Sequence, residues 1–379
     1  MDNFIVSARK YRPSKFLDVV GQQQVSETLK KALSSGKLAQ SFLFCGPRGV
    51  GKTTCARILA KAINCENPGT DFEPCNQCNS CMAFNQNASF NIFELDAASN
   101  NSVDDIRTLV DQVRFAPQSG KYKVYIIDEV HMLSASAFNA FLKTLEEPPS
   151  YAIFILATTE KHKIIPTILS RCQIFDFKRI SDKDIVMQLQ KICDNEGVEA
   201  EPSALHVIAQ KADGGLRDAL SLFDKIVSYA GKKVTYQDVI TNLNILDHDY
   251  YFKITEYFML EDSSSVLNAF NDIVNNGFDG EMFILGLAEH FRNLLICKDE
   301  KTVQLLEAAD DVKDKYFKQS GMANETFLLN ALSVINQCDV NYQLAKNKRL
   351  HVELALLKVC FLNTQIEQTL SVLLGEKKN

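Results

Sequence analysis

Short apolar runs alternate with longer amphipathic stretches over the first 178 residues of the chain. Each run is apolar at nearly every position rather than at every second one, which is typical of strands buried on both faces. We predict such strands at 41–45, 91–95, 123–127, 152–157 and 174–177. Apolar residues at helical spacing predict helices before and between them, at 24–34, 53–63, 102–114 and 134–146. This order predicts an α/β domain whose parallel sheet carries helices on both faces.

The pattern changes after residue 178. Ser181 or Asp182 can cap a short amphipathic helix that runs through Cys193, and Pro202 can begin the next one. Further along, glycine becomes rare, proline is absent, and long helical patterns follow that are apolar on more than one side. We therefore predict three parts: an α/β domain at 1–178, a small helical domain at 179–243 and an all-α domain at 244–379.

A glycine-rich segment follows the first predicted strand. Residues 46–53 read Gly-Pro-Arg-Gly-Val-Gly-Lys-Thr, which is the complete G-x-x-x-x-G-K-[ST] pattern of a phosphate-binding loop between a strand and a helix. The glycines let backbone N–H groups face the β- and γ-phosphates, Lys52 supplies a cation, and the Thr53 hydroxyl can coordinate Mg²⁺. We expect nucleotide to bind here, at Gly46, Gly49, Val50, Gly51, Lys52, Thr53 and Thr54.

An acidic pair, Asp128-Glu129, ends the third predicted strand. Since the carboxyl ends of parallel strands meet at one edge of a sheet, this pair is expected beside the phosphate loop. We assign Asp128 to the Mg²⁺ shell and Glu129 to the water that attacks the γ-phosphate. Acidic residues at strand ends are often only solvated, and the intact loop is what favours the catalytic interpretation. His131 is expected to be hydrogen-bonded near the site rather than catalytic.

Four of the chain's 11 cysteines are grouped. Cys75, Cys78 and Cys81 form two overlapping C-x-x-C steps, and Cys65 ends the helix before them. Four thiolates in this spacing are typical of a closed, structural Zn²⁺ site, with an iron–sulfur cluster as the alternative. Four thiolates fill a tetrahedral coordination sphere and leave no open position for catalysis, so we predict a structural metal centre.

Composition narrows the class of protein. A net charge of -6 argues against a protein that coats nucleic acid through overall basicity. No apolar run approaches the length of a membrane span, and the first residues lack the basic and apolar regions of a secretory signal. We therefore expect a cytoplasmic protein without membrane contact.

Several further motifs occur in an order that resembles one family. They are Ala8-Arg9-Lys10-Tyr11-Arg12-Pro13, Val20-Gly21-Gln22, Ala157-Thr158-Thr159-Glu160, Ser170-Arg171-Cys172 and Gly214-Gly215-Leu216-Arg217-Asp218. Together with the phosphate loop, the four cysteines and Asp128-Glu129-Val130-His131, they resemble the clamp-loader branch of the AAA+ ATPases. The resemblance implies a P-loop AAA+ domain, a helical lid over 179–243 and a helical collar over 244–379.

The resemblance also implies roles for residues outside the loop. Thr158 would sense the γ-phosphate, unless it is an ordinary strand residue. Arg171 would be an arginine finger that acts on the ATP of a neighbouring subunit, with a surface salt bridge as the alternative. Arg217 would reach from the lid to the γ-phosphate and couple the lid angle to nucleotide state, or else belong to a plain loop and cap. The adenine and ribose would lie against Arg9, Tyr11, Arg12, Pro13 and Val20, which otherwise form a basic tail.

The function implied by the resemblance is ATP-driven loading of a ring-shaped sliding clamp onto primed DNA in replication. The implied partners are the other loader subunits in a pentameric ring, further copies through the collar, the clamp and primed DNA, with ATP or ADP, Mg²⁺ and Zn²⁺ as ligands. A ring chaperone, a helicase, a helicase loader and a non-hydrolysing scaffold subunit are the alternatives. We expect no polymerase site, because no two-metal polymerase pattern is present. The chain ends soon after the expected collar, so we expect it to lack the extension of longer family members.

Overall fold

The computed structural model describes residues 5–69, 71–117, 120–243, 245–299, 301–306 and 310–364. The chain divides into two compact units, Met1–Thr235 and Tyr236–Asn379, and each is described by itself. Residues 179–235 of the expected lid lie within the first unit and residues 236–243 within the second. The boundaries predicted at 178 and 243 stay predictions. None of the helices in the described ranges combines the length and the apolar content that a membrane span requires.

The first unit is built on a five-stranded parallel sheet in the order β2-β3-β4-β1-β5. The strands are β1 (Ser41–Cys45), β2 (Ile92–Asp96), β3 (Lys123–Asp128), β4 (Ala152–Thr158) and β5 (Gln173–Asp176). All five predicted strands are confirmed to within one residue at each end. Every residue of β1 and β4 is buried, which explains why their sequences are continuously apolar.

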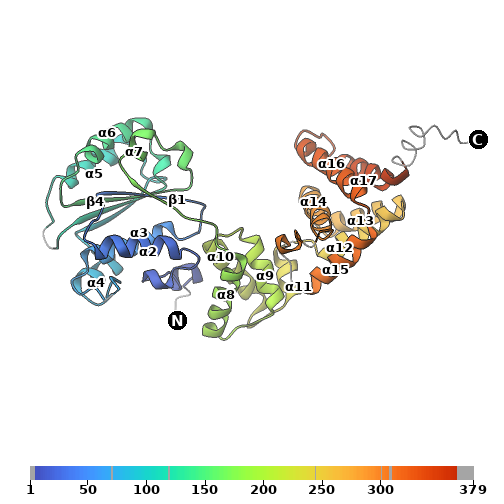
Figure 1. Ribbon diagram of the computed structural model, residues 1–379, viewed down its shortest axis with the longest axis horizontal. Coiled ribbons are helices and arrows are strands. Elements are labelled where there is room, and N and C mark those ends of the chain that lie inside the picture. The colour runs from blue at the N-terminus through green and yellow to red at the C-terminus, as the bar shows by residue number, and fades with distance from the viewer. Residues whose placement is uncertain are drawn as a thin grey trace, which may run out of the picture. The chain divides into compact units, whose positions relative to one another are not determined.

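Helices cover both faces of this sheet (Figure 1). One face carries α2 (Gln23–Ser34), α3 (Lys52–Asn64) and α4 (Asn79–Asn85); the other carries α5 (Val103–Val113), α6 (Ala135–Glu146) and α7 (Pro166–Leu169). Successive strand residues enter the two cores in turn: Phe42 and Phe44 pack on the α3 side, whereas Leu43 packs on the α6 side. The α/β class predicted from the alternating pattern is therefore confirmed.

The first unit also contains shorter helical elements. They are α1 (Ser7–Lys10), η1 (Phe16–Asp18), η2 (Val130–Met132) and η3 (Lys161–Lys163). The helical part of the first unit consists of α8 (Asp182–Glu196), α9 (Pro202–Lys211) and α10 (Leu216–Ala230). Ser181 rather than Asp182 caps α8, because its hydroxyl accepts from the backbone N–H of Asp184 at 3.2 Å. Two two-residue strands, β6 (Glu199–Ala200) and β7 (Lys233–Val234), pair in parallel and are too short to be read from a pattern.

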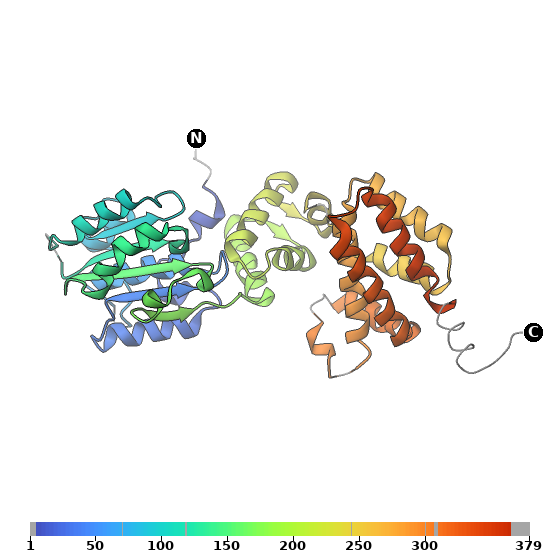
Figure 2. The ribbon, with the colours of Figure 1, turned by 90° about the horizontal axis from the view of Figure 1, so that it is seen from above.

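The second unit is helical. Its elements are α11 (Tyr236–Leu243), α12 (His248–Met259), α13 (Ser263–Asn275), α14 (Gly280–Ile296), η4 (Val303–Leu305), α15 (Asp310–Met322), α16 (Glu325–Tyr342) and α17 (Lys348–Cys360). Helices α16 and α17 lie side by side (Figure 1, Figure 2), and both contact α14. The long helices predicted for this part of the chain are confirmed.

A buried histidine holds a polar network in the core of this unit. His290 is 1% exposed; its Nδ1 lies 3.2 Å from the Tyr316 hydroxyl and its Nε2 lies 3.0 Å from Gln319 Oε1. Burial lowers the pKa of His290 to about 3, since the charged imidazolium is poorly solvated there. The ring is therefore neutral at physiological pH and its partners are satisfied.

Acid is expected to destabilise the protein through His290. Below pH 6.5 the unfolded chain binds a proton at this residue and the folded chain does not until the pH approaches 3, so stability falls as pH falls through that window. Between pH 7 and pH 5 the loss is on the order of 2 kcal/mol. Thermal unfolding of wild type and His290→Gln at both pH values measures it. The variant should lose less on acidification, while the exposed His162→Gln control should behave as wild type; equal losses in all three proteins would contradict the assignment.

Candidate nucleotide site and metal centre

The phosphate loop lies between the end of β1 and the start of α3. Its glycines have backbone conformations that side chains disfavour, with φ of 149° at Gly46 and 104° at Gly51. A β-carbon at Gly46 would collide with the backbone carbonyl oxygen of Phe177. The turn therefore favours glycine at both positions, and Gly46 is also required by its close packing against the connection from β5 to α8.

Lys52, the first residue of α3, turns back into this loop. Its ammonium donates to the carbonyl oxygens of Gly46 at 2.8 Å and Pro47 at 2.7 Å, and the residue is 5% exposed. Burial lowers the pKa of Lys52, and the nearby carboxylates of Glu129 and Asp128 oppose that shift. A buried ammonium held against the loop is placed to neutralise phosphate charge.

Thr53 and Asp128 are brought together across the edge of the sheet. The Thr53 hydroxyl donates to Asp128 Oδ2 at 2.6 Å, and Asp128 Oδ1 accepts from the backbone N–H of Glu129 at 3.0 Å. A hydroxyl and a carboxylate at the head of a phosphate loop are the oxygen ligands that Mg²⁺ takes in such sites. The residues therefore fit the ion expected from the sequence.

Glu129 is held in place by the residue after the expected sensor. It has a left-handed backbone (φ 48°), and its Oε2 accepts from the backbone N–H of Thr159 at 3.2 Å and from the Thr159 hydroxyl at 3.0 Å. Sequence reasoning missed Thr159, although it adjoins Thr158 in the quoted Ala-Thr-Thr-Glu motif. Only the register of the strand end shows which threonine faces the carboxylate.

Thr158 itself is fully buried, and its Oγ1 lies 3.0 Å from His131 Nδ1. The other ring nitrogen of His131 lies 3.0 Å from Glu160 Oε2. This geometry agrees with the expectation that His131 is a hydrogen-bonded, structural residue. The sensing role of Thr158 stays a prediction. Its partner His131 also lies near Glu129, with Nδ1 at 3.5 Å from Glu129 Oε2.

A cavity of about 440 Å³ opens beside the loop. Among the residues expected to hold nucleotide, it is lined by Arg9, Tyr11, Arg12, Pro13, Val20, Gly49, Val50, Gly51, Lys52, Thr53, Thr54, Asp128, Glu129 and Arg217. It is also lined by residues that sequence reasoning did not select, among them Arg48, Ile180, Leu216 and Leu220. Within the described part of the chain, Gly46, Thr158 and Arg171 do not line it.

The segment 7–20, here called the arm, joins this cavity to the helical part of the first unit. The backbone N–H of Ser7 donates to Asp224 Oδ2 on α10 at 2.7 Å, and Lys10 donates to Glu196 on α8 at 2.6 Å. Arg12 Nε lies 3.3 Å from the Thr54 hydroxyl, and burial together with the neighbouring Arg57 lowers the pKa of Arg12. The arm thus crosses from α10 to the phosphate-loop helix.

Arg217 and Arg171 differ in their surroundings. Arg217 is the second residue of α10. Its backbone N–H donates to the Gly49 carbonyl at 3.3 Å, and Arg217 lines the cavity. Arg171 instead pairs with Glu146 on α6 at 2.9 Å and donates to the Thr167 carbonyl at 2.8 Å. Within this chain Arg171 forms the salt bridge that the sequence left as the alternative, and its action on a neighbouring subunit stays a prediction.

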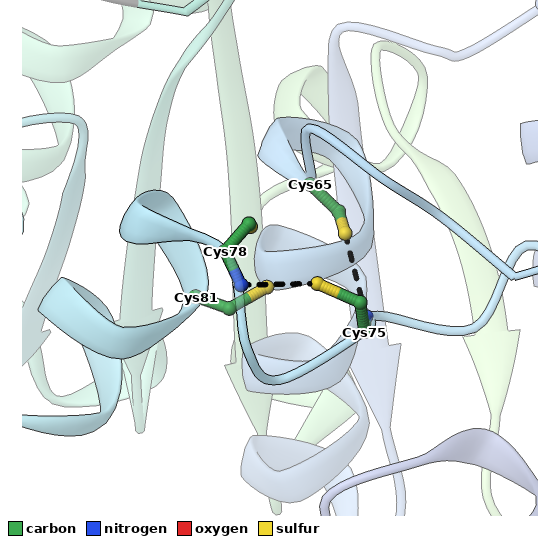
Figure 3. A group of neighbouring side chains, drawn as sticks. All are labelled: Cys65, Cys75, Cys78 and Cys81. Atoms are coloured by element: carbon green, nitrogen blue, oxygen red, sulfur yellow. Dashed lines mark hydrogen bonds between the residues drawn. The ribbon is translucent and has the colours of Figure 1, made fainter.

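The four grouped cysteines converge (Figure 3). The sulfur atoms of Cys65, Cys75, Cys78 and Cys81 all lie within 4.8 Å of one another, against about 3.8 Å between ligands of a tetrahedral zinc–thiolate centre. Backbone N–H groups point at the sulfurs: that of Cys78 lies 3.2 Å from Cys75 Sγ, and that of Cys75 lies 3.3 Å from Cys65 Sγ. The donor set therefore fits a closed metal centre.

The thiols of this cluster differ in acidity. The backbone N–H of Gln77 stabilises the Cys75 thiolate and lowers the pKa of Cys75 to about 6. Burial raises the pKa of Cys65 and of Cys81, because a lone thiolate is poorly solvated there. A divalent cation would supply the positive charge that stabilises these buried thiolates. Metal binding and deprotonation of the thiols are therefore linked.

Comparison with known proteins identifies the family. Residues 21–181 match a family described as "DNA polymerase III, delta subunit", and residues 184–232 match "DNA polymerase III clamp loader subunit, ATPase lid domain". The chain is 42% identical over 352 residues to the DNA polymerase III subunit tau of Bacillus subtilis, covering 93% of this chain and 62% of that protein. The chain thus spans less than two thirds of the length of this longer relative.

A shorter relative is matched over nearly its whole length. The DNA polymerase III subunit gamma of Buchnera aphidicola (subsp. Baizongia pistaciae) is 34% identical over 373 residues, which is 96% of this chain and 98% of that protein. The solved Thermotoga maritima RuvB Holliday junction branch migration motor is 20% identical, with a TM-score of 0.46 over 65% of this chain and 78% of that one. From the relatives in sequence and the clamp-loader lid model, the chain belongs to the gamma/tau subunit family of DNA polymerase III.

Proposed function

We propose that this chain is an ATPase subunit of a DNA polymerase III clamp loader, which uses ATP binding and hydrolysis to open a sliding clamp and load it on primed DNA. The observation that carries the proposal is the cavity in which phosphate loop, acidic pair, arm and Arg217 meet. An intact Lys52, Thr53, Asp128 and Glu129 set favours a hydrolysing subunit over a scaffold subunit.

Each side chain has a role in this proposal. Thr53 and Asp128 would hold Mg²⁺, which when bound neutralises charge on the β- and γ-phosphates. Lys52 holds the same phosphates, and Glu129, fixed by Thr159, accepts a proton from the attacking water. Arg9, Tyr11, Arg12, Pro13 and Val20 enclose the base and ribose.

Arg217 would couple the lid to the nucleotide bound at the phosphate loop. Leu216, Arg217 and Leu220 of α10 line the same cavity as Lys52 and Glu129. A γ-phosphate that binds Arg217 therefore pulls on α10, and its release after hydrolysis removes that contact. This is how one chemical step could alternate a loader between holding and releasing clamp and DNA.

Replacing Arg171 tests whether neighbouring subunits complete the site. Arg171→Ala should leave nucleotide affinity of the isolated chain within about twofold, because Arg171 is outside its own cavity. In an assembly built only from the variant, turnover should fall by about 10³-fold or more, as for other arginine fingers. Phosphate release in wild-type and variant assemblies measures this. Glu146→Gln also breaks the salt bridge but keeps the arginine, and should retain turnover; equal turnover in the Arg171→Ala assembly would refute a finger role.

The outer face of α17 supports a role in assembly. Leu350 and Leu354 on α17, and Phe361 directly after it, are 49%, 50% and 41% exposed, while other residues of the helix pack on α13, α14 and α16. Exposed apolar residues at helical spacing are typical of a surface that binds another protein. We propose that the second unit forms the collar through which loader subunits, including further copies of this chain, join in a pentameric ring. Sizing the purified chain alone and with those subunits, in ATP and in ADP, tests it.

The proposed function is tested by ATPase rates of the reconstituted loader with and without primed DNA and its clamp. Stimulation by both together is expected. An ATPase that neither changes would favour another AAA+ remodelling role, such as a ring chaperone or helicase loader. We further propose that the chain works in the cytoplasm, carries no polymerase site of its own, and binds structural zinc at Cys65, Cys75, Cys78 and Cys81. Elemental analysis distinguishes zinc from iron.

A further inference from the structure

The cysteine-bearing segment 65–81, here called the insert, contacts the arm at Phe16 and Leu17, farther along the chain than the arm's contacts with α8 and α10. Glu73, in the loop between Cys65 and Cys75, accepts from the backbone N–H of Phe16 at 2.7 Å and of Leu17 at 3.1 Å. Its carboxylate also pairs with Lys30 on α2 at 2.7 Å, and its side chain is only 13% exposed. One carboxylate thus binds two backbone donors of the arm and the ammonium of Lys30 on α2.

Asn76 forms a second link between insert and arm. Its Oδ1 accepts from Lys61 of α3 at 2.6 Å, and its Nδ2 lies 3.5 Å from the Ser14 carbonyl oxygen. Lys61 is 5% exposed and also lies 3.3 Å from Asn85 Oδ1 on α4. The insert is therefore tied both to the arm and to the helix that begins with the phosphate-binding lysine.

The contacted part of the arm lies between two stretches that line the nucleotide cavity. Tyr11 to Pro13 line it on one side of the contact, and Val19 and Val20 line it on the other. Phe16 is 1% exposed and packs in the core beneath the arm. With its other end bonded to Asp224 and Glu196, the arm is held at two points, one on the lid helices and one on the insert.

The anchoring residues lie next to the metal ligands. Glu73 is two residues before Cys75, and Asn76 lies between Cys75 and Cys78. A metal that fixes these cysteines also fixes the backbone on which Glu73 and Asn76 stand. Without the metal, the loop loses conformational entropy when it becomes ordered. That entropy cost weakens the binding of any ligand that needs the arm in place.

We infer that the cysteine-bearing insert is the fixed anchor of the nucleotide-covering arm, with Glu73 as its positioning residue, so that metal at the four cysteines and nucleotide in the cavity stabilise each other. This inference depends on the nucleotide site proposed above. The metal centre would then do more than order its own loop. It would hold the arm, which forms one wall of the cavity, while movement of the lid displaces the wall formed by α10. By linkage, the coupling must act equally in both directions.

Glu73→Gln is the sharpest variant. Its amide keeps one acceptor oxygen but places an NH₂ group against the second backbone N–H, so one of the two arm contacts is lost. Asp71→Asn is the matched control, since Asp71 is exposed in the same loop and has no hydrogen bond to the arm among the described residues. Both variants remove one negative charge and leave the four cysteines intact.

The experiment measures the Kd of a fluorescent ADP analogue for the full chain, loaded with Zn²⁺ or stripped by a chelator. In wild type and Asp71→Asn, stripping should raise Kd about three- to tenfold, the net contribution of about one ordinary hydrogen bond. Zinc-loaded Glu73→Gln should already show a similar rise, and stripping should add less than about twofold, because the two changes break the same link. Circular dichroism establishes that each protein is folded.

The reverse direction needs no variant. Zn²⁺ release from wild type to a chromogenic chelator should slow in saturating ADP by a comparable factor. The inference is overturned if stripping leaves the wild-type Kd unchanged, if ADP does not slow release, if no Zn²⁺ binds, or if Glu73→Gln retains the full effect of stripping. Should zinc-loaded wild type bind no ADP at all, the proposed nucleotide function fails instead.

Discussion

Lys52→Ala should abolish nucleotide binding at ordinary concentrations. The Lys52 ammonium is buried against the loop carbonyls and would be the loop's fixed cation for the phosphates. Removing one partner of a desolvated charged hydrogen-bond pair costs about 2–5 kcal/mol, which is about 30- to 5,000-fold in Kd. The fold should survive, because the substitution removes a buried charge and keeps a good helix former at the start of α3.

Titration of a fluorescent ATP analogue measures this loss, and thermal unfolding checks the fold. Lys37→Ala is the control, since Lys37 is exposed and outside the cavity. The control should bind as wild type. A Lys52→Ala protein that binds nucleotide with unchanged affinity would remove the phosphate loop from the account, and with it the proposed ATPase.

Glu129→Gln should separate binding from hydrolysis. The glutamine oxygen can still accept from the backbone N–H and hydroxyl of Thr159, so the side chain should keep its position. It cannot accept a proton from water, and loss of a positioned general base costs about 10²- to 10⁴-fold in rate. We expect nucleotide affinity within a few-fold of wild type and an assembly that binds ATP but turns it over very slowly.

Single-turnover hydrolysis in the assembled loader, alongside nucleotide affinity, provides the measurement. Glu147→Gln makes the same chemical change at an exposed site on the C-terminal side of α6 and should be active. If Glu129→Gln hydrolyses ATP at the wild-type rate, another residue activates the water. A joint loss of binding and turnover would instead mean that Glu129 holds the strand end in place.

Most of the sheet and its flanking helices could be predicted, because each element carries its own signal. A strand buried on both faces, such as Ala152–Thr158, has to be continuously apolar, and Ser102 with Asp105 marks the start of α5 by a capping box. The pairing of β6 with β7 could not be predicted, because two residues carry no period. The residues of the phosphate loop and acidic pair were also found, since their chemistry requires a local motif next to a strand.

Contacts between residues far apart in the chain could not be predicted from the sequence. The sequence shows a Thr158-Thr159 pair, but the path of β4 beyond its last residue turns Thr159 toward Glu129 and buries Thr158 against His131. Similarly, nothing local to Arg171 shows its pairing with Glu146, and nothing local to Glu73 shows that it binds Phe16 and Leu17. Such partners depend on how elements pack, which no spacing rule reports.

The amino-acid sequence alone was sufficient for the class of fold, the phosphate loop, the acidic pair and the four cysteines, because each needs particular residues at short range. Contacts across the first unit set the rest: which threonine holds Glu129, and how the arm is held between lid helices and cysteine insert. The physical reason is that a hydrogen bond depends on distance and direction in space, and residues such as Phe16 and Glu73 acquire both only when the α/β core has packed around them.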